Sequence, residues 1–379
     1  MMSPLMDTIR YLAKEIGPRG SATPQEKQAA EYIAKRLSEA GMDTDIQPFQ
    51  APGTFSLTFS LIYLGFIVAV ALYHISPLAS CILAMLSLLL FVAEQDGVET
   101  LSRVMPKGPS QNVRGIRSPS SKPKQRLIIT AHMDSSRAAL LWHPSMVAGF
   151  RRSLILMTAA MFVIVALSLV GLMVPLRSLW LVQVACALYL TVSVLIMVHR
   201  ELFMKHTPGA NDNASGVAVL LAAAETLTDL QQTELWAVAT GCEEAGLFGM
   251  QRFMEAHHFD REHTYFINLD NLGAGKTAYI TGEGILRFYP SDPTLLKIAG
   301  EVVAEQGLDA ESRPYRALTT DSQIPLRRGY KAMSIMAFDQ RGVLPNWHWE
   351  TDTPDNIDPT TVETAYRLLI GIAHKLDAR

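Results

Sequence analysis

The sequence predicts an α/β protein with a doubly wound, mostly parallel mixed sheet that is flanked by helices and interrupted by two transmembrane helical hairpins. Short apolar runs that end in glycine or polar residues alternate with helical patterns, as in parallel strands joined by helices. Two long apolar segments interrupt this alternation. Acidic and histidine residues follow several predicted strands, at the edge of the sheet where α/β proteins bind ligands.

Composition narrows the classes of function. The chain has 379 residues, of which 49% are hydrophobic and only 18% are charged, and its net charge is −3. This charge gives no indication of a nucleic-acid partner. The three cysteines form no disulfide framework, which fits a reducing compartment.

The N-terminal region predicts two helices and an edge strand. Apolar residues recur at helical spacing in residues 1–15, which lack the features of a signal peptide. A Thr-Pro start and a closing glycine delimit a second helix over residues 24–40. Residues 43–49 alternate between polar and apolar side chains, as an edge strand does.

Two apolar segments are interpreted as transmembrane hairpins. Residues 55–93 contain no Asp, Glu, Lys or Arg and are divided near Pro77. Residues 153–198 repeat this pattern in two apolar halves, which Pro175, Leu176 and Arg177 separate. Because a membrane span needs about 20 apolar residues, each hairpin predicts two spans, although the second half of the first hairpin is slightly short. A buried hairpin in a soluble core is the alternative for each segment. The hairpins lack ionisable residues near their midplanes, which argues against a transporter.

The remaining segments complete the α/β pattern. Further strands are predicted at 111–117, 126–131, 235–239, 264–269, 277–281 and 333–337, and further helices at 217–227, 247–256 and 359–376. Both insertions contain an even number of spans, so the segments around them lie on one side of the membrane. Residues 1–54, 94–152 and 199–379 are therefore expected to form one domain.

The distribution of basic residues predicts the orientation of this multi-pass membrane protein. The flanks on the side of the domain carry Arg103, Lys107, Arg137, Arg151, Arg152, Arg200 and Lys205, whereas the turns on the far side carry only Arg177. Cytoplasmic loops are enriched in lysine and arginine, which places the catalytic domain in the cytoplasm.

Two adjacent acids, Glu243 and Glu244, follow the predicted strand at 235–239 and a glycine. Like charges this close raise each other's pKa unless a cation neutralises them. The carboxyl ends of parallel strands form the ligand crevice of α/β sheets. The pair is therefore interpreted as part of a cation site.

Other residues of suitable chemistry occur at strand ends and in loops. His132, Asp212, Asp270 and His348 are candidate ligands, and Asp134 follows His132 closely enough to orient its ring. Two histidines, two aspartates and one glutamate suit a pair of borderline-hard divalent ions, with one carboxylate bridging them. One member of the glutamate pair then remains as the general base.

The motifs occur in the order HMD, GANDNASG, EEAGLFG, NLDN and a late histidine. In this order they resemble those of the co-catalytic di-zinc aminopeptidases and their carboxypeptidase relatives (metallopeptidase clan MH). The resemblance covers residues 1–50, 110–140 and 206–379. It implies that one zinc is held by His132, Asp212 and Asp270 and the other by Asp212, Glu244 and His348. It also implies that Glu243 is the base and that Asp134 is the aspartate behind His132.

The chain departs from this family pattern in two ways. Family members often have Ser-Asp-His at the substrate end of the pocket, whereas here Asp321 is followed by Ser322. The two apolar hairpins are also absent from the usual soluble catalytic domain.

The predicted function is that of a membrane-bound, zinc-dependent exopeptidase of the aminopeptidase type, acting on a peptide or an amino-acid amide. An amidase for lipid-linked or N-acyl amino acids at the membrane is the first alternative. A non-catalytic receptor or scaffold of the same fold is the second, but it is expected to have lost ligands, and none is lost here. Glutaminyl cyclases are a weaker match, since they use one metal.

Overall fold

The computed structural model describes residues 4–174 and 176–379. Pro175, at the predicted break of the second hairpin, and residues 1–3 of the predicted first helix lie outside the described residues. The chain divides into two compact units. The first contains the described part of Met1–Gly53 together with Lys107–Ala138 and His206–Arg379, and the second contains Thr54–Pro106 and Ala139–Lys205.

A nine-stranded mixed sheet forms the centre of the first unit, in the order β1-β2-β4-β3-β5-β9-β6-β7, with β8 also paired to β6. The strands are β1 (Asp43–Ala51), β2 (Gly108–Arg117), β3 (Gln125–His132), β4 (Thr233–Thr240), β5 (Thr264–Leu269), β6 (Lys276–Glu283), β7 (Tyr289–Pro290), β8 (Ala310–Tyr315) and β9 (Lys331–Phe338).

The prediction of a mostly parallel sheet holds at the centre and fails toward the edges. Strands β4, β3, β5 and β9 run parallel to one another. Four pairs nearer the edges, β1–β2, β2–β4, β6–β9 and β6–β7, are antiparallel. Because the four central strands are parallel, their carboxyl ends lie at one edge of the sheet.

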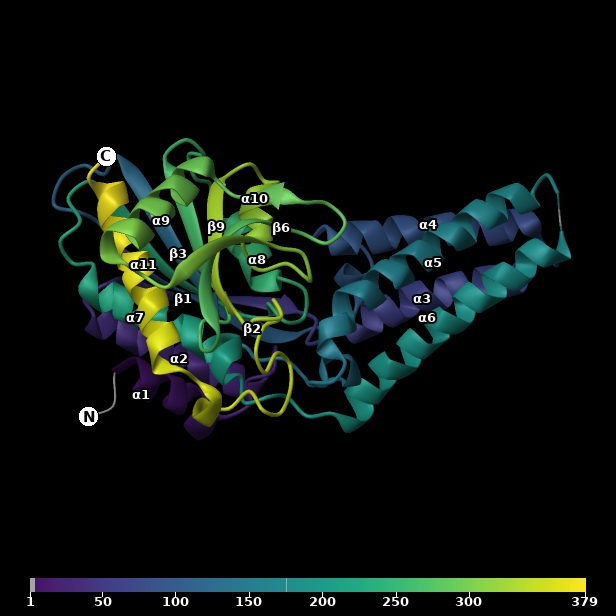
Figure 1. Cartoon of the computed structure of the whole chain (residues 1–379), viewed down its shortest axis with the longest axis horizontal. Helices are drawn as coiled ribbons and strands as arrows, with labels where there is room; N and C mark the ends of the chain where they lie inside the picture. Colours follow the sequence, from purple (N-terminus) through teal and green to yellow (C-terminus); the bar gives the residue numbers. More distant parts are fainter. Residues whose placement is uncertain (1–3, 175) are drawn as a thin grey trace. The chain divides into compact units, whose positions relative to one another are not determined.

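Helices cover both faces of the sheet (Figure 1). They are α1 (Pro4–Arg10), which continues as a π-helical turn over Tyr11–Ile16, and α2 (Pro24–Glu39), α7 (Ser215–Thr226), α8 (Phe248–Ala256), α9 (Pro293–Gln306), α10 (Gln323–Arg327) and α11 (Pro359–Asp377). Alternate residues of each strand point to opposite faces. Leu127 and Ile129 pack with α1, α2, α7, α9 and α11, whereas Ile128 packs on the face that α8 and α10 cover.

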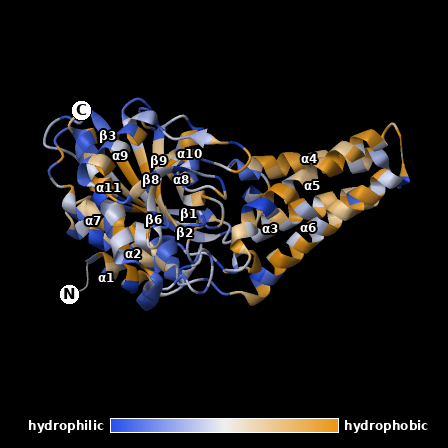
Figure 2. Cartoon of the chain, in the orientation of Figure 1, coloured by the Kyte–Doolittle hydropathy of each residue, from blue (hydrophilic) through white to orange (hydrophobic). Residues whose placement is uncertain are grey.

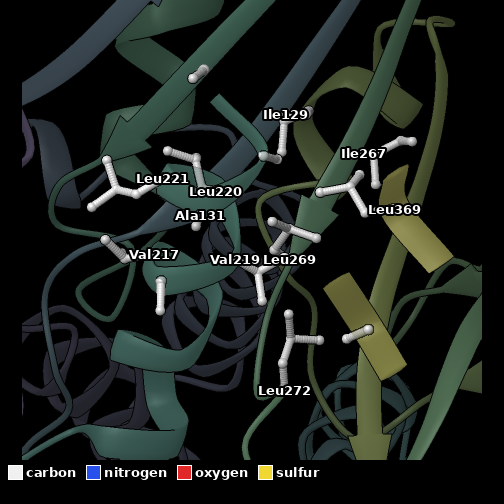
Figure 3. Close-up of a cluster of buried hydrophobic side chains, with 14 of the residues drawn as sticks. Ile129, Ala131, Val217, Val219, Leu220, Leu221, Ile267, Leu269, Leu272 and Leu369 are labelled. Carbon is white, nitrogen blue, oxygen red and sulfur yellow. The ribbon is translucent and has the colours of Figure 1, made fainter. Parts of the chain in front are cut away.

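The larger core lies between the sheet and helices α7 and α11 (Figure 3). Ile129, Ile267 and Leu269 extend from β3 and β5 toward Leu220 and Leu369, and all five side chains are at most 1% exposed. This packing fixes the strands whose ends carry the candidate site residues.

The second unit is a bundle of four apolar helices, α3 (Ser56–Leu72), α4 (Pro77–Gln95), α5 (Phe150–Gly171) and α6 (Arg177–Phe203). Helix α3 packs against α4 and α6, and α5 packs against the same two helices. Short 3₁₀ turns occur at Ser102–Val104, Leu140–Trp142 and Val147–Gly149.

The length and composition of the helices support three of the four predicted spans. Among the described residues, three helical segments are long and apolar enough to cross a membrane, namely Pro77–Gln95, Val147–Gly171 and Arg177–Phe203. Helix α3 was expected to be the longer half of the first hairpin, yet it has only 17 residues. Helix α4 gains length by continuing to Gln95, and Glu94 accepts hydrogen bonds from the backbone N–H groups of Thr100 and Ser102 just beyond its end.

The bundle buries several polar side chains and exposes many apolar ones. Ser80, Ser168 and Gln183 are fully buried, and the Gln183 amide donates to the Ser168 hydroxyl at 3.0 Å. Leu188 and Leu195 on α6 are 62% and 61% exposed. Figure 2 shows the resulting hydrophobic colouring of these four helices. The apolar outer surface differs from the polar outer surface of a water-soluble bundle.

Candidate active site

The carboxyl ends of three neighbouring strands bring four candidate residues to one edge of the sheet. His132 is the last residue of β3 and pairs in register with Thr240, the last residue of β4. Glu243 and Glu244 follow β4 after two further residues, and Asp270 follows β5 directly. The parallel arrangement of β4, β3 and β5 therefore produces the cluster that the sequence predicts.

Asp212 reaches the same place from a buried turn over Ala210–Ala214 that precedes α7. The Asp352 carboxylate accepts hydrogen bonds from the backbone N–H groups of Asn211 at 2.6 Å and Asp212 at 3.1 Å. The Asn213 amide donates to the carbonyl of Leu269, the last residue of β5, at 2.8 Å. These bonds fix the Asp212 loop to the end of the sheet.

His348 lies on a tight turn between β9 and α11. Asn346 and His348 both have positive φ, at 59° and 50°. The backbone N–H of Trp349 donates to the Asn346 carbonyl at 3.2 Å, and that of Asp352 donates to the Trp349 carbonyl at 2.9 Å. The same turn thus supplies the His348 ring and the carboxylate that anchors the Asp212 loop.

Asp212 lies between the two imidazole rings. Its Oδ1 is 3.1 Å from His132 Nε2, and its Oδ2 is 3.0 Å from His348 Nε2. Each ring also faces a second acid, with Glu244 Oε2 3.1 Å from His348 Nε2 and Asp270 Oδ1 3.9 Å from His132 Nε2. The five predicted ligands therefore form two groups that share Asp212.

Asp134 connects the His132 ring with the glutamate loop. The backbone N–H groups of Glu243 and Glu244 donate to its Oδ1 and Oδ2 at 3.1 and 3.2 Å. His132 Nδ1 lies 3.1 Å from the Asp134 carbonyl and 3.5 Å from its Oδ1. This arrangement holds the ring so that Nε2 faces Asp212 and Asp270.

The buried charges of the cluster perturb one another strongly. Burial lowers the pKa of His348, but Glu244 and Asp212 outweigh it and raise this pKa to about 9. Burial likewise opposes protonation of His132, yet Glu243 and the nearby aspartates raise its pKa well above the usual value. Burial and Glu244 raise the pKa of Glu243 well above its usual range, against the opposing effect of His132. Without a cation, protons on the imidazoles balance the carboxylates.

The donor set fits divalent metal ions. One ligand atom each from His132, Asp212 and Glu244 lies within 4.8 Å of the others, and all three residues have nearly buried side chains. Glu244 Oε1 is buried without a hydrogen-bond partner, as expected of an oxygen that faces a cation site. Imidazole nitrogen and carboxylate oxygen are typical zinc donors.

The departure at Ser322 has a structural explanation. Ser322 Oγ accepts a hydrogen bond at 2.9 Å from Ser334 Oγ, which also lies 3.1 Å from the Glu283 carboxylate. Asp321 is 1% exposed, and its Oδ2 accepts a hydrogen bond from the Thr240 hydroxyl. Ser322 therefore belongs to a buried cluster of hydroxyl groups around Glu283, whereas Asp321 lies at the end of β4.

Sequence reasoning missed several residues that support the site. Asp352 lies in an acidic stretch and carried no individual signal. Arg19, Ser21 and Glu26 have long-range contacts with the ligand loops. Glu26 carried a signal, since it is the last residue of a Thr-x-x-Glu pattern, but helix capping accounts for that pattern.

Comparison with known proteins agrees with this geometry. Residues 191–373 match the model of peptidase family M28. The probable lipoprotein aminopeptidase LpqL of Mycobacterium tuberculosis is 27% identical over 190 residues, which cover 41% of this chain and 37% of that protein. The chain thus aligns with well under half the length of this curated relative.

Solved structures show the same fold. The zinc aminopeptidase BSAP of Bacillus subtilis superposes with a TM-score of 0.58 at 16% identity, covering 98% of this chain and 94% of that one. The glutaminyl cyclase of Porphyromonas gingivalis has a TM-score of 0.58 at 14% identity, covering 98% and 97%. The matched region, just under half of the chain, is similar to peptidase family M28, which confirms the predicted resemblance to the zinc aminopeptidases and supports the predicted class, a zinc-dependent peptidase.

Proposed function

We propose that the chain is a membrane-bound, zinc-dependent exopeptidase of the aminopeptidase type, with a cytoplasmic catalytic domain. The observation that carries this proposal is the position of Asp212 between His132 and His348, each within 3.1 Å of a different oxygen of its carboxylate. A carboxylate that faces two imidazoles in this way is suited to bridge two metal ions.

The proposed ligands follow from this geometry. His132, Asp212 and Asp270 would hold one zinc ion, and Asp212, Glu244 and His348 would hold the other. When bound, two such ions lower the pKa of water and stabilise negative charge on the oxygen of the scissile amide. Asp134 would keep the His132 ring in place through the contacts described above.

We assign the general base to Glu243. Its backbone N–H donates to Asp134, and burial and the neighbouring Glu244 raise the pKa of its carboxyl group above the usual range, which suits a group that accepts and returns a proton. The carboxylate would take a proton from water as the water oxygen bonds to the carbonyl carbon. It would then give this proton to the leaving nitrogen as the carbon–nitrogen bond breaks.

We further propose that the second unit is embedded in a lipid bilayer. Helix packing in membranes places small and polar residues at the interface between helices and leaves apolar side chains to the lipid. The buried Ser80, Ser168 and Gln183 and the exposed Leu188 follow this rule. The cytoplasmic orientation rests on the basic flanks identified in the sequence.

The substrate is proposed to be a peptide with a free N-terminus. An apolar bundle in the same chain as such a site also suits an amidase for lipid-linked or N-acyl amino acids, which is the second candidate. A receptor without activity is disfavoured, because the full set of donors is present and grouped.

The protein purified in detergent and loaded with zinc should release N-terminal residues from short peptides, as followed by mass spectrometry. An N-acyl amino acid with a long acyl chain, assayed in parallel, separates the two candidates. Exclusive cleavage of the N-acyl substrate would favour the amidase. Cleavage of neither substrate by a protein that contains two zinc ions would contradict the proposed activity.

A further inference from the structure

Three side chains near the N-terminus reach three loops of the candidate site. We propose that Arg19, Ser21 and Glu26, called the N-terminal clamp here, are positioning residues that fix the ligand loops and the base loop relative to one another. This inference rests on the proposed function, which assigned no role to these residues.

Arg19 joins the His132 loop to the Asp212 loop. Its side chain is fully buried, and its guanidinium donates to the Met133 carbonyl at 3.0 Å. It also donates to the carbonyls of Pro208 and Gly209, both at 2.8 Å. Met133 follows His132 directly, and Gly209 begins the turn that carries Asp212. One side chain thus sets the spacing between the two loops.

Ser21 acts on the aspartate behind His132. Its hydroxyl donates to Asp134 Oδ2 at 2.6 Å, and both side chains are buried. The same Oδ2 accepts the backbone N–H of Glu244 at 3.2 Å. The Ser21 hydroxyl therefore supports the carboxylate that positions both the His132 ring and the glutamate loop.

Glu26 anchors the glutamate loop from the other side. Its Oε1 accepts the backbone N–H of Cys242 at 2.8 Å, and its Oε2 accepts that of Ala22 at 3.0 Å. Cys242 has a φ of 50°, a conformation that residues other than glycine rarely adopt. Because Glu243 follows Cys242 directly, this hydrogen bond helps to set the direction in which Glu243 leaves the loop.

A purely structural role is the competing explanation. Buried hydrogen bonds often stabilise a fold without affecting chemistry. The two explanations differ in what a mild substitution changes. If the residues only stabilise the fold, loss of stability should accompany every effect. If they position the site, zinc affinity and kcat should change at matched thermal stability.

The first test measures zinc affinity of the full-length protein by competition with a chelator, which requires no activity. Ser21→Ala should bind zinc about tenfold more weakly, since partners behind metal ligands typically contribute 10- to 100-fold. Ser38→Ala, near the exposed end of α2, is the matched control and should match wild type. Unchanged zinc affinity in Ser21→Ala would overturn the inference.

The second test concerns Glu26 and uses kcat and KM. Glu26→Met removes both acceptors and should lower kcat about tenfold or more with little change in KM, the signature of a misplaced base. Glu26→Gln keeps an acceptor for Cys242 and should recover much of the loss. Adding Cys242→Gly to Glu26→Met should also recover part of kcat, because glycine adopts a positive φ without support.

The outcomes distinguish a failure of the proposed positioning role from a failure of the proposed function. A folded Glu26→Met variant with wild-type kcat, or a loss that neither Glu26→Gln nor Cys242→Gly relieves, would contradict the positioning role of Glu26. If Glu26→Met does not fold, the Ser21→Ala zinc affinity decides the question. A wild type that binds zinc but cleaves no substrate would contradict the proposed function, and the zinc measurement would still test the clamp.

Discussion

Replacing Glu243 and Glu244 by glutamine, one at a time, should show which of them is the general base and which is the metal ligand. Glu243→Gln and Glu244→Gln each remove one negative charge from neighbouring positions of the same loop. Glu244 Oε2 lies 3.1 Å from His348 Nε2, within the group of donors, so its substitution should release metal. Glu243 is held through its backbone N–H by Asp134, a contact that a change of side chain leaves in place.

The expected magnitudes follow from these roles. Loss of a general base typically costs 10² to 10⁴ in rate, which corresponds to about 3 to 5 kcal/mol of activation free energy. Glu243→Gln should therefore keep its full zinc content and lose kcat by this factor, with little change in KM. Glu244→Gln should lose zinc, and its activity should fall with its metal content.

Both variants should be compared with wild type for zinc content by elemental analysis and for kcat on the same peptide. If Glu243→Gln loses metal while Glu244→Gln retains two ions, the two roles are reversed. If Glu243→Gln retains metal and full turnover, the base is another residue.

Three further predictions follow from the site and the topology. His348→Ala should lower the zinc content of the protein from about two ions to about one, as measured by elemental analysis, and an unchanged content would contradict the ligand assignment. Zinc affinity measured by chelator competition should rise with pH up to about 9. Below its raised pKa of about 9 the His348 ring carries a proton, and zinc must displace this proton to bind. An affinity that is independent of pH between 7 and 9 would contradict this prediction. A single cysteine at Ser118 in a cysteine-free background should react with an impermeant reagent only after the cells are permeabilised, and labelling in intact cells would reverse the orientation.

The sequence predicted the centre of the fold because its signals are local. Each central strand is a short apolar run, and His132 at the end of β3, Asp270 after β5 and the glutamate pair after β4 are identified by position alone. The edges of the sheet were harder to predict. Strand β8 is short and largely exposed, and α9 was missed although Asp292 and Pro293 form a typical helix start.

The lengths of the apolar helices also depended on details outside the hydrophobic pattern. The first run looked long enough for a span, but α3 ends at Leu72 where the turn toward Pro77 begins. The second run looked short, but α4 continues through two polar residues to Gln95. Hydropathy located the hairpins but not the ends of their helices.

The candidate ligands were predictable, and most of their supporting contacts were not. The ligands have diagnostic side chains at strand ends. The supporting contacts join residues far apart in sequence, such as Ser21 with Asp134, 113 residues apart, and Glu26 with Cys242, 216 residues apart. Serine and glutamate near a helix start are explained by capping, so only the folded chain reveals these contacts.

Similarity of fold alone does not identify the reaction. The zinc aminopeptidase of Bacillus subtilis and the glutaminyl cyclase of Porphyromonas gingivalis give the same TM-score of 0.58. The proposal of an exopeptidase therefore depends on the arrangement of donors around Asp212 and on the spare glutamate beside Glu244.

The central claim is that Asp212 bridges two zinc ions, and an anomalous difference map at the zinc absorption edge tests it most directly. Crystals of the zinc-loaded protein should show two peaks about 3.5 to 4 Å apart, the separation typical of two-metal sites. One peak should lie between Asp212 and His132, and the other between Asp212 and His348. A single peak, or two peaks that do not share Asp212, would contradict the account.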